Sequence, residues 1–178
     1  MMTMNVLESK TAPSGALTAT DRDLGALTDC FYVDFPRKVT LEEYVYGFYT
    51  TSLFKMERAV LSVVIRKPST DNDALLLSQN KTDSFSAWTV ESRKPDQILL
   101  RDYRGDTKSW LMVQPVTVDA RLATRLYFGT VVVPKKVSKD GQKSVHFAFY
   151  LFGGFHRVYS RALLRSAFKR LSRDVGAI

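Results

Sequence analysis

The sequence predicts an α+β fold in which an antiparallel sheet is followed by a long C-terminal helix. From Phe85 onward, apolar and polar residues alternate through four consecutive segments, a pattern typical of half-buried strands. Near the C-terminus the apolar residues instead recur at spacings of three and four, as in an amphipathic helix. With 178 residues, 45% of them hydrophobic, the chain is long enough for one domain with its own core.

The first third of the chain predicts an arm, a strand and two helices. Residues 1–23 are polar, rich in small side chains and without a period, so we expect a mobile N-terminal arm in front of a single domain at residues 24–178. The segment "LTDCFYVDFP" predicts a strand that stops at Pro36. Thr40 can cap a helix that begins with "LEEYVYGFY", where two glutamates follow in the first turn.

A second helix is predicted over "SLFKMERAVLSVVI". Its apolar stripe comprises Leu53, Met56, Val60 and the pair Val63/Val64. The following segment "STDNDALLLSQNKTD" is rich in Asp, Asn, Ser and Thr, so we expect it to form a loop around a short apolar piece.

Four strands are predicted in the middle of the chain. The segments "SFSAWTVESR", "DQILLRDY", "KSWLMVQPV" and "ATRLYFGTVVVP" are separated by short turn sequences, which indicates an antiparallel meander. Because side chains alternate between the faces of a strand, we expect the inner face to carry the pairs Trp88 with Val90, Ile98 with Leu100, Trp110 with Met112, and Leu126 with Phe128. Gly129 is expected to form a bulge that curves the sheet.

The stretch "FAFYLFGGFHRVYSRALLRSAFKRLSR" predicts the long helix, with a bend at Gly153–Gly154. Its apolar run is only about half of the roughly 20 residues that a membrane-spanning helix needs. Leu164, Phe168 and Leu171 form a stripe that we expect to pack against the sheet.

The net charge of +8 lies entirely in the C-terminal part of the chain, because residues 1–134 carry equal numbers of acidic and basic side chains. The cations Arg157, Arg161, Arg165, Lys169 and Arg173 recur every four residues. Such a stripe can meet phosphates or anionic lipid, but a solvated helix face is its commoner meaning. We expect Arg165, Lys169 and Arg173 to face solvent and consider a nucleic-acid partner unlikely.

Few side chains suggest chemistry. Cys30 is the single cysteine, so an intrachain disulfide is impossible, and neither His146 nor His156 has a second metal ligand at a recognisable spacing. No catalytic motif, metal site or cofactor-binding sequence is apparent. The first residues lack a basic start and an apolar run, which favours a cytoplasmic protein without a transmembrane segment.

The order of elements, with "SFSAWTVESRKPDQILLRDYRGDTKSWLMVQPV" and "FAFYLFGGFHRVYSRALLRSAFKRL", resembles the START-like (SRPBCC) superfamily. In particular it is similar to an uncharacterised bacterial branch, a domain of unknown function. The match lies in Phe155, His156 and the cations Arg157, Arg161 and Arg165, within a helix that has glycines where the branch has proline. The resemblance implies a helix-grip fold, in which a curved antiparallel sheet wraps the last helix, and a cavity between them for an apolar or amphipathic small molecule.

The residues expected to line this cavity come from both sides of it. They are Trp88, Trp110, Phe128, Phe155, His156 and Tyr159. Three classes of function follow. The first is a module that binds a hydrophobic small molecule, such as a lipid. The second is an enzyme similar to polyketide cyclases or dehydratases that uses His156 and tyrosines, and the third is an interaction protein that uses the basic helix.

Overall fold

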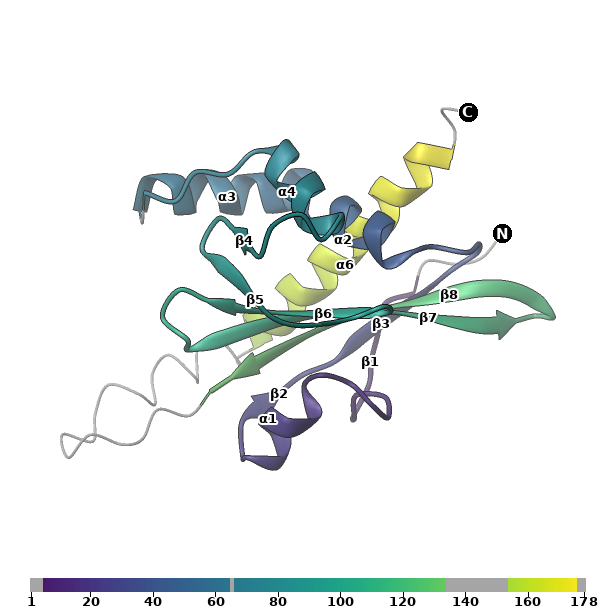
Figure 1. The fold of residues 1–178 in the computed structure, drawn as a ribbon. Coiled ribbons are helices and arrows are strands. Elements are labelled where there is room, and N and C mark those ends of the chain that lie inside the picture. The colour runs from purple at the N-terminus through teal and green to yellow at the C-terminus, as the bar shows by residue number, and fades with distance from the viewer. Residues whose placement is uncertain (1–4, 65, 134–153, 176–178) are drawn as a thin grey trace.

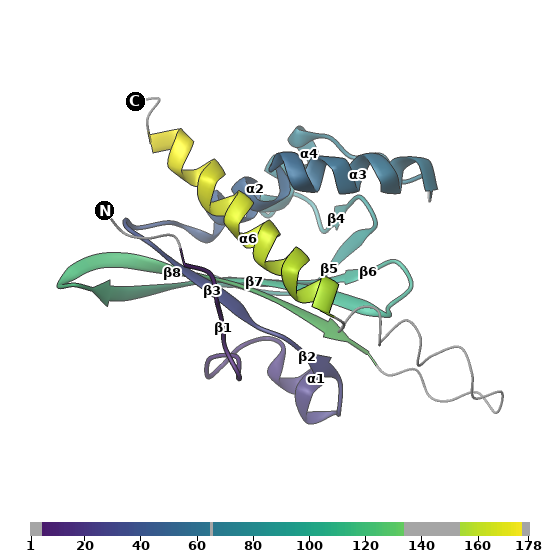
Figure 2. The same cartoon turned by 180° about the vertical axis from the view of Figure 1, so that it is seen from behind.

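The computed structural model describes residues 5–64, 66–133 and 154–175, which form an α+β fold. Figure 1 shows a curved antiparallel sheet with α2, α3, α4 and α6 on one face and α1 on the other. The same arrangement is visible from behind in Figure 2, where α6 runs diagonally across the sheet. Gly153 and the expected loop after the last strand lie outside the described residues.

The sheet has eight strands in the order β1-β3-β8-β7-β6-β5-β4, with β2 paired to β8, and every pairing is antiparallel. The strands are β1 (Leu7–Glu8), β2 (Leu27–Thr28), β3 (Phe31–Phe35), β4 (Ser84–Phe85), β5 (Trp88–Lys94), β6 (Gln97–Asp102), β7 (Thr107–Val118) and β8 (Arg121–Val132). The predicted meander therefore corresponds to β5 through β8, and the predicted first strand to β3.

The helices are α1 (Ala19–Asp23), α2 (Leu41–Tyr49), α3 (Ser52–Val64), α4 (Asp71–Ser78) and α6 (Gly154–Val175). Thr40 caps α2 as predicted, and its hydroxyl accepts a hydrogen bond from the Glu43 N–H. The helix α4 replaces the predicted loop. Thr70 and Asp73 form a second capping box there, which shows that the acidic and hydroxyl residues of this segment start a helix.

The C-terminal helix packs on the covered face of the sheet through the predicted stripe. Leu164 and Leu171 are buried, and the Phe168 ring meets Phe35 of β3 edge-on with 4.8 Å between ring centroids. Leu171 reaches α2, where a Cβ on Gly47 would lie only 3.1 Å from it. This part of the predicted architecture is confirmed.

The predicted apolar stripe of α3 is wrong at Met56 and Val63, whereas Leu53 packs against the apolar cluster as expected. Met56 and Val63 are 65% and 79% exposed, whereas Phe54 and Arg58 are buried. The actual inner face is set by contacts from neighbouring elements, since Phe54 packs on Tyr49 and the Arg58 guanidinium binds Asp71 of α4. A helix can thus leave apolar side chains exposed to solvent when its aromatic and charged side chains find partners on the opposite side.

The N-terminal segment, expected to be a mobile arm, is packed against the sheet over residues 5–23. Its Ala16 and Thr18 are buried, and α1 lies on the face of the sheet opposite the other helices (Figure 1). The Gln97 side chain accepts a hydrogen bond from the Leu17 N–H and donates one to the Gly15 carbonyl. Specific backbone contacts, which a polar composition does not reveal, therefore hold this segment.

Trp110 lies on the face of the sheet that the N-terminal segment covers. Its predicted assignment, with Met112, to the helix-covered inner face is therefore wrong. In the register of β7 and β8, Trp110 lies opposite Gly129, and it is Leu111 that shares the helix-covered face with Phe128. Gly129 continues the ladder where a bulge was expected. A Cβ there would lie 2.6 Å from the Asp29 carbonyl and 3.0 Å from the indole, so only glycine leaves room for Trp110.

Candidate functional site

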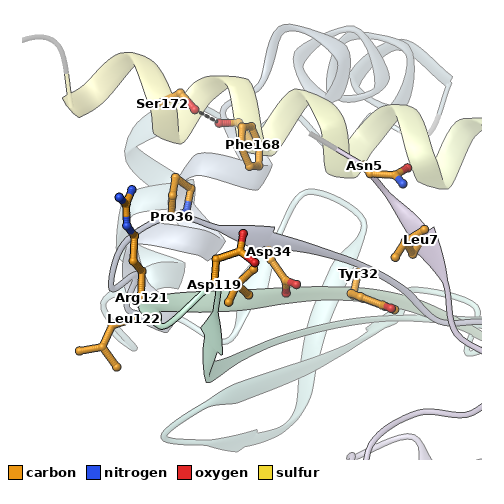
Figure 3. A pocket seen from close by; sticks show the side chains of 11 residues that line it. Asn5, Leu7, Tyr32, Asp34, Pro36, Asp119, Arg121, Leu122, Phe168 and Ser172 are labelled. Carbon is orange, nitrogen blue, oxygen red and sulfur yellow. Dashed lines mark hydrogen bonds between the residues drawn. The ribbon is translucent and has the colours of Figure 1, made fainter. Parts of the chain in front are cut away.

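A groove of about 880 Å³ lies between the sheet and the C-terminal half of α6. Its apolar walls are Leu7 of β1, Pro36 after β3, Leu122 of β8 and Phe168 of α6. Figure 3 shows Phe168 pointing from α6 toward the sheet, with Pro36 and Leu122 below it. Leu122 is 81% exposed because the hairpin of β7 and β8 extends past the helices, so an apolar wall of the groove is open to solvent.

The polar lining of the groove divides into a neutralised and an exposed part. The Asp34 carboxylate accepts two hydrogen bonds from the Arg125 guanidinium, at 2.7 and 2.9 Å, and that guanidinium stacks over Tyr32. Asp119 and Arg121 at the hairpin tip are both exposed, and neither is in an ion pair with another described residue. Polar groups that could fix the orientation of a ligand are therefore at the tip.

A second group of polar side chains lies beside the N-terminal half of α6. The Tyr159 hydroxyl donates a hydrogen bond to Oε2 of Glu57, which joins α6 to α3. Burial raises the pKa of the Glu57 carboxyl, although the bond from Tyr159 acts against that increase. The pKa of Tyr159 is also raised, by burial and by the nearby Glu57 charge. Burial therefore disfavours the charged form of both groups.

Nε of the buried Arg58 has no hydrogen-bond partner among the described residues, and two aromatic side chains of the same layer also carry a buried donor without one. These two donors are the Tyr49 hydroxyl and the Trp88 indole N–H. Tyr49 is only 1% exposed, and burial raises the pKa of its hydroxyl well above the usual range. A buried donor without an acceptor is costly, so these two atoms mark a place where an acceptor is expected.

The neighbouring cations do not neutralise Glu57. Arg58 and Lys55 both bind the Asp71 carboxylate, Arg58 at 2.9 Å. Burial alone would raise the pKa of Asp71, but these two cations lower it. The ion pairs that Arg58 and Lys55 of α3 make with Asp71 of α4 therefore do not include Glu57.

The structure brings three of the six predicted cavity residues to one face of the sheet. Trp88, Phe128 and Tyr159 belong to the apolar cluster under the helices, whereas Trp110 is on the opposite face. Phe155 and His156 lie in the first turn of α6, and their side chains are outside the described part of the structure. The predicted common pocket with both tryptophans therefore does not form, while the roles of Phe155 and His156 stay predictions.

Sequence reasoning did not identify Glu57 or Tyr49 as polar groups of this layer. Glu57 sits in a helix whose apolar stripe was assigned to the opposite side, and Tyr49 reads as one more aromatic core residue. One signal was available: Glu57 follows the buried Phe54 by three residues, which places both on one side of a helix.

The basic stripe of α6 is partly neutralised. Arg157 and Arg161 each lie 3.3 Å from the Glu8 carboxylate of β1, and Arg161 also lies over the Phe31 ring. Arg165, Lys169 and Arg173 are exposed, as predicted. Two of the five cations thus fasten the helix to the sheet edge, which weakens the interpretation of the stripe as a continuous phosphate-binding surface.

The remaining reactive groups are inert or scattered. Burial, assisted by the Asp29 charge, raises the pKa of the Cys30 thiol to about 12, which suppresses the thiolate. Over residues 5–64, 66–133 and 154–175, no three His, Cys, Asp or Glu side chains gather as a metal site would require. Within the same ranges, no helix is both long and apolar enough to span a bilayer.

Comparison with known proteins adds no relative. The sequence matches no protein-family model, and no curated protein matches it at a significant level. Function is therefore inferred from the groove beside Phe168 and from the polar side chains around Glu57.

Proposed function

We propose that the protein is a binding module for an apolar or amphipathic small molecule held between the sheet and the C-terminal helix. The observation that carries this proposal is the groove beside Phe168, whose volume of about 880 Å³ is within the usual range of roughly 300–1,000 Å³ for small-molecule sites. The order of elements and the position of α6 over the sheet are compatible with a helix-grip fold of START-like type, and we include that assignment in the proposal.

The lining of the groove suits a ligand with two chemically different ends. Leu7, Pro36, Leu122 and Phe168 offer apolar surface to a hydrocarbon body, and burying each Å² of that surface contributes about 25 cal/mol. Arg121 and Asp119 at the hairpin tip can meet a polar headgroup at the solvent side. Fatty acids, isoprenoids and aromatic polyketides share this division into an apolar body and a polar end.

A thermal-shift screen with these three ligand classes tests the proposal. We expect at least one class to raise the melting temperature, because a ligand that binds only the folded state stabilises it. Leu122→Asp should abolish that shift by placing a charge in the apolar wall. Leu24→Asp is the matched control, since Leu24 is 78% exposed at the end of α1, outside the groove.

Two outcomes would count against the groove. Absence of a shift with all three classes would remove the proposed function. A shift of equal size in the wild type and in Leu122→Asp would place the ligand elsewhere in the molecule.

A further inference from the structure

We propose that Tyr49, Glu57, Trp88 and Tyr159 form a second binding site, which takes the hydroxyl group of an otherwise apolar molecule. None of these residues lines the groove beside Phe168, so the inference goes beyond the proposed function. It depends on three features of this part of the fold: the packing that gathers the residues, the two donors without partners, and the carboxyl group of Glu57.

An aromatic cluster brings the four residues together. The Tyr49 ring lies 4.8 Å from Phe54 of α3 and 5.0 Å from Phe85 of β4, measured between centroids. Phe85 is paired with Trp88 in the register of β4 and β5, so Tyr49 and Trp88 flank the same ring. Glu57 lies one turn beyond Phe54 on α3 and binds Tyr159 of α6. Three helices and two strands thus meet around one apolar surface.

The two donors define what a ligand must supply. The Tyr49 hydroxyl and the Trp88 N–H can each donate a hydrogen bond, and neither makes one of regular geometry to a described residue, although the Ser109 side chain lies near enough to Tyr49 to lower its pKa. An oxygen atom of a ligand would satisfy at least one of them. A hydrocarbon alone would leave both buried donors without an acceptor, which is energetically unfavourable.

Glu57 selects among oxygen-bearing groups. Its Oε2 accepts the bond from Tyr159, and its other oxygen has no hydrogen-bond partner within the described ranges. A carboxylate or phosphate ligand would bring a negative charge to this buried carboxyl. The nearby Arg58 guanidinium, which lies over the Phe85 ring, is already paired with Asp71, so such a ligand would have to compete with Asp71 for it. A hydroxyl group both accepts and donates, so it can bind the tyrosine or indole donor and Glu57 at once.

Binding of 2-naphthol and naphthalene to the full chain tests the site, because the two probes differ only in the hydroxyl group. We expect the wild type to bind 2-naphthol at least about tenfold more tightly than naphthalene in a fluorescence or calorimetric titration. Tyr49→Phe keeps the ring and removes one donor, so it should weaken 2-naphthol binding about fivefold and leave naphthalene binding unchanged. Trp88→Phe should act in the same direction and serves if Tyr49→Phe does not fold.

Tyr103→Phe is the matched control, since Tyr103 is exposed on the turn between β6 and β7 and its hydroxyl meets only Arg104. Leu122→Asp separates the two sites: it should preserve 2-naphthol binding even where it abolishes ligand binding in the groove. The proposal is overturned if the wild type shows no preference for 2-naphthol over naphthalene. Unchanged 2-naphthol affinity in both donor variants would overturn it as well.

Discussion

The two faces of the sheet are covered in physically different ways. Under the helices, a large apolar cluster extends from Phe31 through Leu126 to Leu164, with its aromatic rings packed edge to face. On the other face, a small cluster around Trp110 and Cys30 is covered by the N-terminal segment. There the indole N–H binds the Gln97 side chain, which also holds Leu17.

Polar contacts hold much of the N-terminal segment against the second face of the sheet. Lys108 on β7 is buried between the carboxylates of Asp21 and Glu91, 2.7 Å from the former. Burial alone would lower the pKa of Lys108, but these two acids raise it. The comparison teaches that one face is stabilised by the amount of apolar surface removed from water, and the other by a few bonds whose partners must all be present.

The largest effect is expected from a cavity on the helix-covered face. Leu164→Ala removes a fully buried side chain at the centre of α6 and should lower the free energy of unfolding by about 3–5 kcal/mol. Phe168→Ala should cost less, because Phe168 is only partly buried beside the groove. Denaturant unfolding measures both, and Val158→Ala on the exposed side of α6 is the control. Equal values for Leu164→Ala and Val158→Ala would contradict the packing described for this face.

On the second face, Gln97→Leu should lower the free energy of unfolding by about 2–3 kcal/mol, because it leaves the buried Trp110 N–H and the Leu17 N–H without their acceptor. Hydrogen exchange should show loss of protection over residues 5–23 before the rest of the fold. Gln114→Leu on the neighbouring strand β7 loses the hydrogen bond that Gln114 accepts from the Tyr127 hydroxyl and should leave that segment protected. Unaltered protection in Gln97→Leu would mean that apolar contacts alone hold the cover.

Glu57 is an acidic side chain under the helices, and the pH dependence of stability tests its role. Its pKa in the folded state is raised above the ordinary 4.5, so its favourable contribution is full below about pH 4.5 and is lost as pH rises through the folded value. Glu57→Gln should therefore gain stability over the wild type as pH increases, by about 1.4 kcal/mol for each unit of raised pKa. Thermal unfolding from pH 4 to pH 8 measures the difference, with the exposed Glu42→Gln as control. A difference that does not change over this range would contradict the raised pKa.

The smallest effect is expected at the hairpin tip, which extends beyond the helices that cover the sheet. Asp119 and Ala120 have φ of 49° and 59°, as a two-residue turn with positive φ at both positions requires. Ala120→Gly should raise the free energy of unfolding by about 0.5–1 kcal/mol, since glycine adopts this conformation without strain. A loss of stability in a denaturant titration would show that the turn is held by contacts that outweigh its backbone preference.

Much of the fold could be read from local pattern. Alternation predicted the strands β5 to β8, the Thr40 cap predicted the start of α2, and the spacing of Leu164, Phe168 and Leu171 predicted the packed side of α6. These features depend on neighbours along the chain, because helix and strand periods fix which side chains share a face.

Only the tertiary structure decided what covers each face and which polar atoms meet. Trp110 turned to the second face because Gly129, from another strand, leaves room for the indole there. Residues 5–23 were docked by Gln97 and Lys108, each far away in sequence. The same holds for Glu57 and Tyr159, which are 102 residues apart and carry no local signal of their meeting. The sequence by itself determined the periodicity of the helices and strands, and which side of α6 packs on the sheet. Burial and hydrogen bonding between distant segments decided the rest, because their free energies exist only once the chain has folded.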